Sequence, residues 1–158
     1  MYHIEYKDLV DFDPNTFTNV NRGKIVVKGI EPSLNLRIGS AVRAQLTATL
    51  LNIDEQDGLP PLRNRPERRA TAYVVYDATE RSSLHAAFNA TSNFLDRSNP
   101  TGDIEMGGYG IVDVGYTLRW QQFQLTLSVD NLFNKYYEQF VGFPGQDRRF
   151  RIEVRGDF

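Results

Sequence analysis

Polar and apolar residues alternate along most of this chain with the two-residue period of a β-strand. The clearest run covers residues 122–129, where Phe123, Leu125, Leu127 and Val129 alternate with glutamine, threonine and serine. Similar alternation predicts about eight strands, each with one apolar and one polar side. Their expected positions are 2–7, 24–38, 42–50, 69–76, 83–90, 111–120, 122–129 and 149–158.

The links between these strands alternate in length. Tight turns are expected near Gly39 and Ser40, within residues 77–82 and at residues 120–122. Long links are expected after the first, third, fifth and seventh strands, from Phe12, Ile53, Phe94 and Asn134. This order predicts an all-β, antiparallel up-and-down meander. Outer-membrane barrels have such a rhythm, with short periplasmic turns and longer extracellular loops.

The alternation fits two environments for the apolar side. A soluble sandwich or barrel buries that side, whereas a transmembrane barrel turns it toward lipid and keeps the polar side in the lumen. In the membrane interpretation, the lipid-facing residues are Val42, Leu46, Leu50, Leu84, Phe88, Val112, Val114, Leu118, Phe123, Leu125, Leu127, Val129, Phe150, Ile152 and Val154. The lumen-facing residues are then Arg43, His85, Asp113, Arg119, Arg151, Glu153 and Arg155. Asp113 could pair with Arg119 or Arg151, although the sequence alone assigns no pairing.

The C-terminal stretch VDNLFNKYYEQFVGFPGQDRRFRIEVRGDF resembles the end of TonB-dependent outer-membrane receptors. The matching motif positions are Val129, Asn131, Leu132, Phe133, Asn134, Lys135 and Tyr137, and the chain ends on an aromatic residue, Phe158. The segment VKGIEPSLNLRI resembles another strand of the same family. The resemblance implies a receptor of the Gram-negative outer membrane that takes up a ferric siderophore or cobalamin. It also implies that Phe158 is the signal read by the barrel-assembly machinery.

Transporters of this family have a 22-stranded barrel with a plugged lumen. About eight strands would be the C-terminal part of that barrel, and no plug domain is present. The expected partners are therefore membrane lipid or detergent, together with the missing strands and plug. Alternatively, a second copy could pair through the edge strands, or the strands could close alone as a small barrel.

Composition narrows these interpretations. The 158 residues allow one domain, 1–158, and the net charge of −2 argues against a nucleic-acid partner. The chain lacks cysteine, which excludes disulfides and thiolate sites. It begins within a strand pattern, without a signal peptide, so we expect a mature fragment of a longer receptor; the alternative is a protein that is not exported.

Candidate chemistry is sparse. His3 and His85 are the only histidines and have no evident catalytic partners, so we expect no enzyme activity and no cofactor. Acidic clusters make weak calcium candidates of Asp11, Asp13, Asp54 and Asp57, but a calcium loop's glycine and closing glutamate are missing, which favours solvated carboxylates. Arg63, Arg65, Arg68 and Arg69 could bind lipopolysaccharide phosphates or form a solvated charged run. Tyr137, Phe140 and Phe143 are candidate ligand contacts in the last long link.

Three interpretations therefore stand. The first is a barrel segment of a TonB-dependent receptor. The second is a small stand-alone or engineered outer-membrane barrel with a structural or ligand-binding role. The third is a soluble, calycin-like barrel that binds an apolar ligand.

Overall fold

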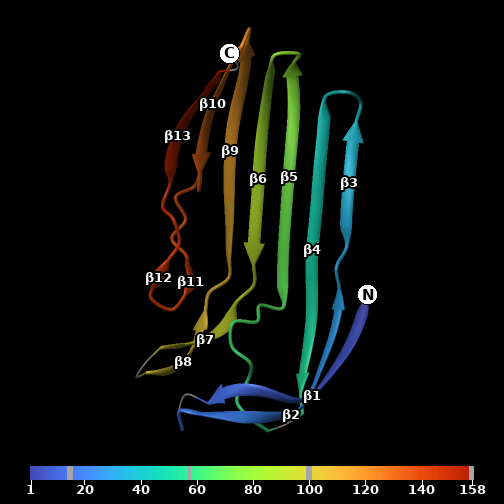
Figure 1. Cartoon of the computed structure of the whole chain (residues 1–158), viewed down its shortest axis with the longest axis vertical. Helices are drawn as coiled ribbons and strands as arrows, with labels where there is room; N and C mark the ends of the chain where they lie inside the picture. Colours follow the sequence, from blue (N-terminus) through green and yellow to red (C-terminus); the bar gives the residue numbers. More distant parts are fainter. Residues whose placement is uncertain (14–15, 57, 99–100, 157–158) are drawn as a thin grey trace.

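One antiparallel sheet dominates the computed structural model, which describes residues 1–13, 16–56, 58–98 and 101–156 (Figure 1). The strand order across the sheet is β1-β2-β4-β5-β6-β9-β10-β13, and β3 also pairs with β4. Two small hairpins, β7-β8 and β11-β12, lie outside it. The sheet strands are β1 (Tyr2–Asp13), β2 (Thr18–Ile30), β3 (Ser33–Ile38), β4 (Val42–Glu55), β5 (Arg68–Thr79), β6 (Ser82–Thr91), β9 (Tyr109–Trp120), β10 (Phe123–Asp130) and β13 (Arg149–Gly156). The hairpin strands are β7 (Phe94–Ser98), β8 (Gly102–Met106), β11 (Glu138–Phe140) and β12 (Phe143–Pro144).

Tight turns close one end of the sheet, as the sequence predicted. They connect β3 to β4, β5 to β6 and β9 to β10 (Figure 1). In two of these turns a residue has a positive φ angle: 59° at Gly39 and 53° at Gln121. Glycine adopts this conformation at no steric cost. The longer links between β4 and β5, β6 and β9, and β10 and β13 lie at the opposite end.

The first link differs from the prediction. A long polar link was expected from Phe12, but β1 continues to Asp13 and β2 already begins at Thr18. The two strands pair along almost their whole length, from Tyr2 opposite Gly29 to Asp13 opposite Thr18. The weak alternation of these polar residues predicted a loop. In the structure, cross-strand pairing extends the hairpin well past the apolar positions.

The predicted second strand is divided in two. The expected strand 24–38 is broken between Ile30 and Ser33, and both parts pair with β4. Pro32 lies at the break, and its carbonyl oxygen accepts a hydrogen bond of 3.0 Å from the amide of Ala48. The register therefore continues through the break, while proline, which has no N–H to donate, interrupts the strand.

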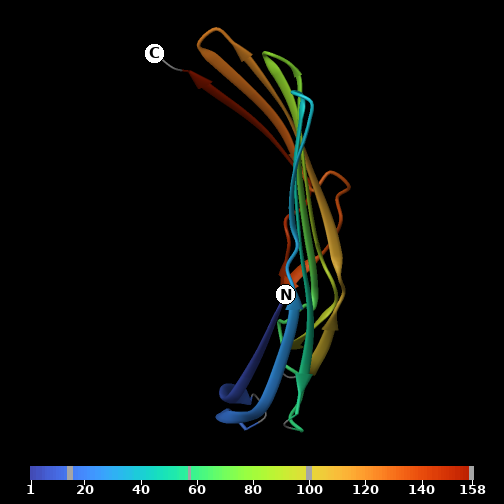
Figure 2. The same ribbon diagram turned by 90° about the vertical axis from the view of Figure 1, so that its right-hand side faces the viewer.

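Cross-strand register gathers the apolar residues on one face. One row across the sheet runs through Val42, Tyr76, Leu84, Tyr116, Leu127 and Ile152, which are directly paired neighbours. We call this side the apolar face, and the side that carries Arg43, His85 and Arg151 the polar face. Figure 2 shows that the sheet is a single curved layer.

Within the described residues, no second layer covers the apolar face. Leu127 is 40% exposed and Ile152 is 75% exposed, and the buried apolar residues of the described ranges are confined to Ile25, Val26, Met106 and Ile111. No helix in the described part of the chain is long and apolar enough to cross a lipid bilayer.

The polarity of the two faces inverts toward the end with the long links. Ile4 pairs with Val27, which pairs with Ile53, and this apolar row lies on the same side as Arg43. On the opposite side, Val26 pairs with Glu5 and Asp54. The apolar face therefore spans only part of the strand length and gives way to charge beyond Leu50.

The sheet is open within the described residues. On one side of the described sheet, β1 pairs only with β2 and β3 pairs only with β4; on the other side, β13 pairs only with β10. Neither β1 nor β3 pairs with β13. Two edges thus leave backbone N–H and C=O groups without strand partners, which is the arrangement that favours pairing with further strands.

Candidate functional site

The long links at one end of the sheet form a loop cluster, which consists of the β1-β2 hairpin end and the links 56–67, 92–108 and 131–148. Side chains join each part to the next. Ion pairs and hydrogen bonds join the described parts, and the partners are far apart in the sequence.

Arg22 joins the first hairpin to the second link. Its side chain is almost fully buried and lies 3.2 Å from Asp11 and 3.5 Å from Glu55. It also donates a hydrogen bond of 2.8 Å to the carbonyl oxygen of Pro60. Glu55 in turn accepts a hydrogen bond of 2.8 Å from the amide of Leu62. A buried guanidinium with two carboxylates and a carbonyl has its charge and donors compensated, which such burial requires.

Arg63 joins the second link to the third. Its Nε donates to Asp103 over 2.8 Å, and Arg97 approaches the same carboxylate at 3.4 Å. The hydrogen bond from Arg63 lowers the pKa of Asp103 below its usual value, and Arg97 adds to the effect. The amide of Asn64 also donates to the carbonyl oxygen of Leu95 over 2.7 Å.

Asp96 joins the third link to the last. Asp96 is 8% exposed, and its Oδ2 accepts a hydrogen bond of 2.7 Å from the amide of Val141, in the turn between β11 and β12. The four parts of the loop cluster are therefore connected in sequence order, each to its neighbour.

The motif residue Asn131 organises the start of the last link. Asn131 is 2% exposed, and its Nδ2 donates to the carbonyl oxygens of Lys135 and Gln146, each over 2.9 Å. Its Oδ1 accepts from the amide of Lys135 over 2.8 Å. Asn131 and Asn134 both have positive φ, which asparagine tolerates better than most residues. The NLFNK segment is thus a structural turn, which the sequence did not reveal.

A cavity of about 520 Å³ opens on the polar face beside this loop cluster. Strand residues Arg69, Thr71, Asn89, Thr91 and Tyr109 contribute one side, and the links contribute the other. The lining residues from the links are Asn64, Arg65, Pro66, Phe94, Gln139 and Phe140. Buried Asn64 Oδ1 and Thr91 Oγ1 have no hydrogen-bond partner within the described structure.

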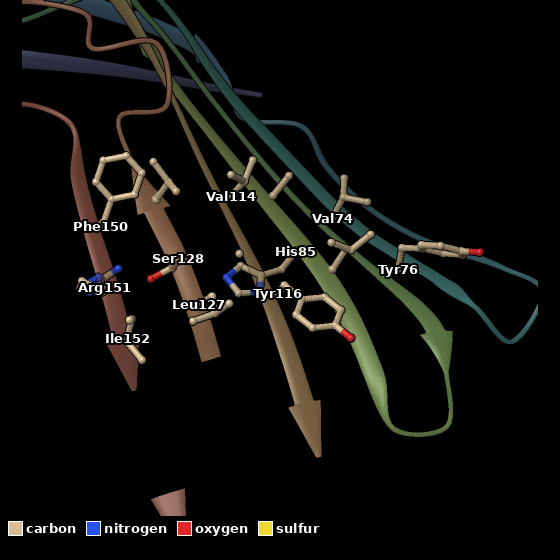
Figure 3. A pocket seen from close by; sticks show the side chains of 14 residues that line it. Val74, Tyr76, His85, Val114, Tyr116, Leu127, Ser128, Phe150, Arg151 and Ile152 are labelled. Carbon is tan, nitrogen blue, oxygen red and sulfur yellow. The ribbon is translucent and has the colours of Figure 1, made fainter. Parts of the chain in front are cut away.

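A second hollow, of about 610 Å³, lies on the apolar face (Figure 3). It crosses five strands, from Val74 in β5 to Ile152 in β13, and Ala86 lies between its cross-strand partners Val74 and Val114. Its surface is almost wholly apolar, which matches hydrocarbon and not a polar nutrient.

The predicted lumen-facing residues share the polar face, but their ion pairs differ from the expected network. Asp113 binds neither Arg119 nor Arg151; its Oδ1 accepts from the amide of Asn131 over 2.7 Å. Arg151 pairs with Asp130 at 2.6 Å instead. Neither of the two pairings that the sequence left open occurs among the described contacts, because the turn at Asn131 binds the Asp113 carboxylate. The remaining pairs are Arg43 with Asp77 at 3.0 Å and Arg155 with Glu153 at 3.6 Å.

His85 lies against its strand neighbours on the polar face. It pairs across the sheet with Gly115, and a Cβ atom at Gly115 would clash with the imidazole ring. The ring also lies 6.4 Å from the ring of Tyr73. His85 therefore packs into space that a glycine leaves open, and no acid, base or nucleophile pairs with it in the described structure.

The three predicted ligand contacts separate. The Tyr137 ring packs on Tyr109, with ring centroids 4.5 Å apart, so it supports the cavity wall from behind. Phe140 lines the cavity itself. Phe143 is 68% exposed and lines none of the described cavities. Sequence reasoning missed Arg69 and Asn89 as cavity residues, although both alternate with apolar positions and so belong to the polar face.

The four arginines proposed for lipopolysaccharide do not form one patch. Arg63 is occupied by Asp103, and Arg65 lines the cavity. Arg68 and Arg69 are adjacent in β5 and therefore point to opposite faces, with Arg68 opposite Leu50 at the border of the apolar face.

The calcium candidates lie apart. Asp11 pairs with Arg22, Asp13 accepts from the Thr16 hydroxyl over 3.0 Å, and Asp54 accepts from Gln56 over 2.7 Å. No metal-binding group of three or more His, Cys, Asp or Glu occurs among the described residues. Asp57 and the predicted assembly signal Phe158 lie outside the described residues.

Comparisons with known proteins agree with this architecture. The family model described as TonB dependent receptor-like, beta-barrel matches residues 1–132. The matched segment ends inside the C-terminal motif, at Leu132. The vitamin B12 transporter BtuB of Vibrio cholerae is 25% identical over 163 residues, which cover 99% of this chain and 26% of the transporter.

Two solved receptors share the fold. The ferric-catecholate import receptor Fiu of E. coli K12, in its closed form, aligns with a TM-score of 0.78 and 22% identity over 96% of this chain and 24% of the receptor. The ferripyoverdine receptor of Pseudomonas aeruginosa aligns with a TM-score of 0.81 and 18% identity over 99% of this chain and 24% of the receptor. The chain spans about a quarter of these proteins. With most of its length matched by the family model, the chain belongs to the TonB-dependent receptor-like β-barrel family.

Proposed function

We propose that this chain is a section of the barrel wall of an outer-membrane receptor that takes up a scarce nutrient, a ferric siderophore or cobalamin. Receptors of its family are transporters of the Gram-negative outer membrane and not enzymes. The observation that carries the proposal is the uncovered apolar face of a single-layer sheet.

The height of the apolar face fits a membrane. In β4 the apolar positions run from Val42 to Leu50, a stretch of nine residues, and a transmembrane β-strand needs about 9–11. Beyond Leu50 the same side carries Asp54, Lys28 and Glu5. This change of polarity supports a bilayer boundary at that level, with the loop cluster outside the cell and the short turns in the periplasm.

The two faces receive their roles from this placement. The fifteen predicted lipid-facing residues and the apolar hollow would contact lipid chains, and the polar face would line the lumen. Of the four arginines considered for lipopolysaccharide, only Arg68 lies at the border of the apolar face. Arg68 is therefore the one that we expect to contact a lipopolysaccharide phosphate.

The open edges support a larger barrel. Unpaired strand edges are not tolerated in hydrocarbon, because each unsatisfied backbone group costs several kcal/mol. At membrane height the two unpaired edges of the described sheet are β3, which pairs with the stretch from Val42 to Thr47, and β13. These edges would therefore pair with the remaining strands of a receptor, whose lumen would hold a plug. A second candidate, a small barrel or a dimer of this chain, would instead pair these edges with each other or with a second copy.

The test is to fold the purified chain in plain buffer and in detergent micelles, and to record circular dichroism and the mass of the folded species. We expect β structure only in micelles. A β-rich, monodisperse monomer in plain buffer would contradict the membrane role. In micelles, a folded monomer would favour the small barrel and a dimer would favour pairing between copies; adding the missing strands of a receptor should raise the folded fraction if the wall proposal is right.

A further inference from the structure

We propose that the cavity beside the loop cluster binds an anionic ligand that carries an aromatic ring. The inference deepens the proposed function, on which it rests, because it chooses among nutrient classes that the family leaves open. The charge, the aromatic rings and the hydrogen-bonding groups of the cavity wall favour such a ligand.

Two guanidinium groups supply positive charge. Arg65 and Arg69 both line the cavity, and no carboxylate lines it with them. Within the described ranges neither arginine forms an ion pair, whereas Arg22, Arg43, Arg63, Arg149 and Arg151 each pair with a carboxylate. Arg65 donates only a long hydrogen bond of 3.3 Å to the carbonyl oxygen of Asn64. Two arginines without a counter-charge at one cavity favour an anion, to which each can donate two hydrogen bonds.

Three aromatic rings supply an apolar surface in the same cavity. Phe94, Tyr109 and Phe140 come from β7, β9 and β11. Tyr109 is held in place by the Tyr137 ring behind it, so part of this surface is preorganised. Flat rings on a cavity wall favour a planar, aromatic group in the ligand.

Neutral polar groups complete the wall. Thr71, Asn89 and Gln139 can donate or accept hydrogen bonds, and Asn64 Oδ1 and Thr91 Oγ1 lack partners. Both unpartnered oxygens are covered, so a side-chain rotation would be needed before a ligand hydroxyl could reach them. The volume of about 520 Å³ lies within the range of about 300–1,000 Å³ found for small-molecule sites.

The neighbouring hollow provides an internal contrast. It measures about 690 Å³ and contains Glu55, Glu67 and Glu105 beside Arg65 and Arg68. Its three carboxylates would repel an anion. The anionic ligand is therefore assigned to the cavity of about 520 Å³ and not to this neighbouring hollow.

The test is calorimetric titration of the chain folded in detergent micelles with three probes. These are the ferric complex of dihydroxybenzoate, which is anionic and aromatic, ferric citrate, which is anionic without a ring, and cyanocobalamin. We expect the dihydroxybenzoate complex to bind most tightly. Arg69→Gln and Arg65→Gln should each weaken its binding about tenfold or more, because a charged hydrogen bond is lost.

Arg119→Gln is the matched control. Arg119 lies on the same face at the opposite end of the sheet and lines neither polar hollow. Binding should be unchanged in this variant. Equal weakening by Arg119→Gln, preference for cyanocobalamin, or equal binding of citrate and the aromatic complex would overturn the ligand assignment.

The outcome separates the two proposals. A chain that folds only in micelles but binds none of the three probes contradicts the ligand assignment and leaves the membrane role intact. A chain that folds in plain buffer and binds the aromatic anion through Arg69 contradicts the membrane role and leaves the ligand assignment intact.

Discussion

Asn131 and Lys135 exchange two hydrogen bonds, from the Lys135 amide to Asn131 Oδ1 and from Asn131 Nδ2 to the Lys135 carbonyl oxygen. This side-chain to backbone pair closes the turn that leads from β10 into the last link. Because a third bond reaches Gln146 at the other end of that link, one amide group fixes both ends of the link.

Asn131→Ala should therefore destabilise the fold by about 3 kcal/mol, because buried backbone groups lose their partners. Asn134→Ala is the control: Asn134 has nearly the same positive φ, but its side chain accepts one bond, from the Arg148 amide. We expect about 1 kcal/mol there. Urea unfolding in micelles measures both values, and equal losses would mean that backbone conformation, and not the hydrogen bonds, explains the asparagine.

Arg22→Met should loosen the β1-β2 hairpin from the second link. The substitution leaves Asp11 and Glu55 without their buried cation, and breaking such a pair costs about 3 kcal/mol. Amide hydrogen exchange across residues 9–13 and 18–22 should accelerate. Lys24→Met, which removes an exposed partner of Glu5, should cost less than about 1 kcal/mol; if it matched Arg22→Met, burial would not be the cause.

Leu127→Asp tests which side of the sheet meets lipid. A carboxylate on the apolar face should cost about 2 kcal/mol near mid-membrane. The matched control is Gln124→Asp in the same strand, because Gln124 lies on the polar face between Arg119 and Arg155. Thr126 is a poorer control, since it faces Glu153. Folding titrations into vesicles measure the difference, and similar losses at both positions would contradict the assigned faces.

Acid should release the second link from the third. Arg63 lowers the pKa of Asp103 in the folded chain, whereas the pKa of an aspartate in an unfolded chain is about 3.9. A lowered pKa means that the pair stabilises the contact fully above about pH 4 and that this contribution disappears as the pH falls through the lowered value.

Hydrogen exchange at the Asn64 amide, which bonds the Leu95 carbonyl, reports this contact. We expect faster exchange at pH 3 than at pH 6, after correction for the intrinsic rate. Asp103→Asn should exchange rapidly at both pH values. An Asp103→Asn contact that stays as closed as the wild-type contact at both pH values would show that Asp103 does not hold it.

The alternation of residue types was sufficient to predict most of the sheet. Val42, Leu46 and Leu50 share a side because adjacent strand residues point in opposite directions, and no tertiary information is needed for that. Short turns were equally local, since Gly39 and the polar residues near it mark a chain reversal. The same reasoning failed at Phe12 and Pro32, where cross-strand pairing extended one strand and preserved the register across a break.

The amino-acid sequence by itself determined the strands, their apolar side and the resemblance to the receptor family, because each depends on residues close together in the chain. The tertiary structure alone decided that Arg22 meets Glu55, that Asp113 binds the Asn131 turn and that Arg65 and Arg69 share a cavity with Tyr109. These contacts depend on strand register and on links that meet only when the sheet has formed, so no local pattern of residues specifies them.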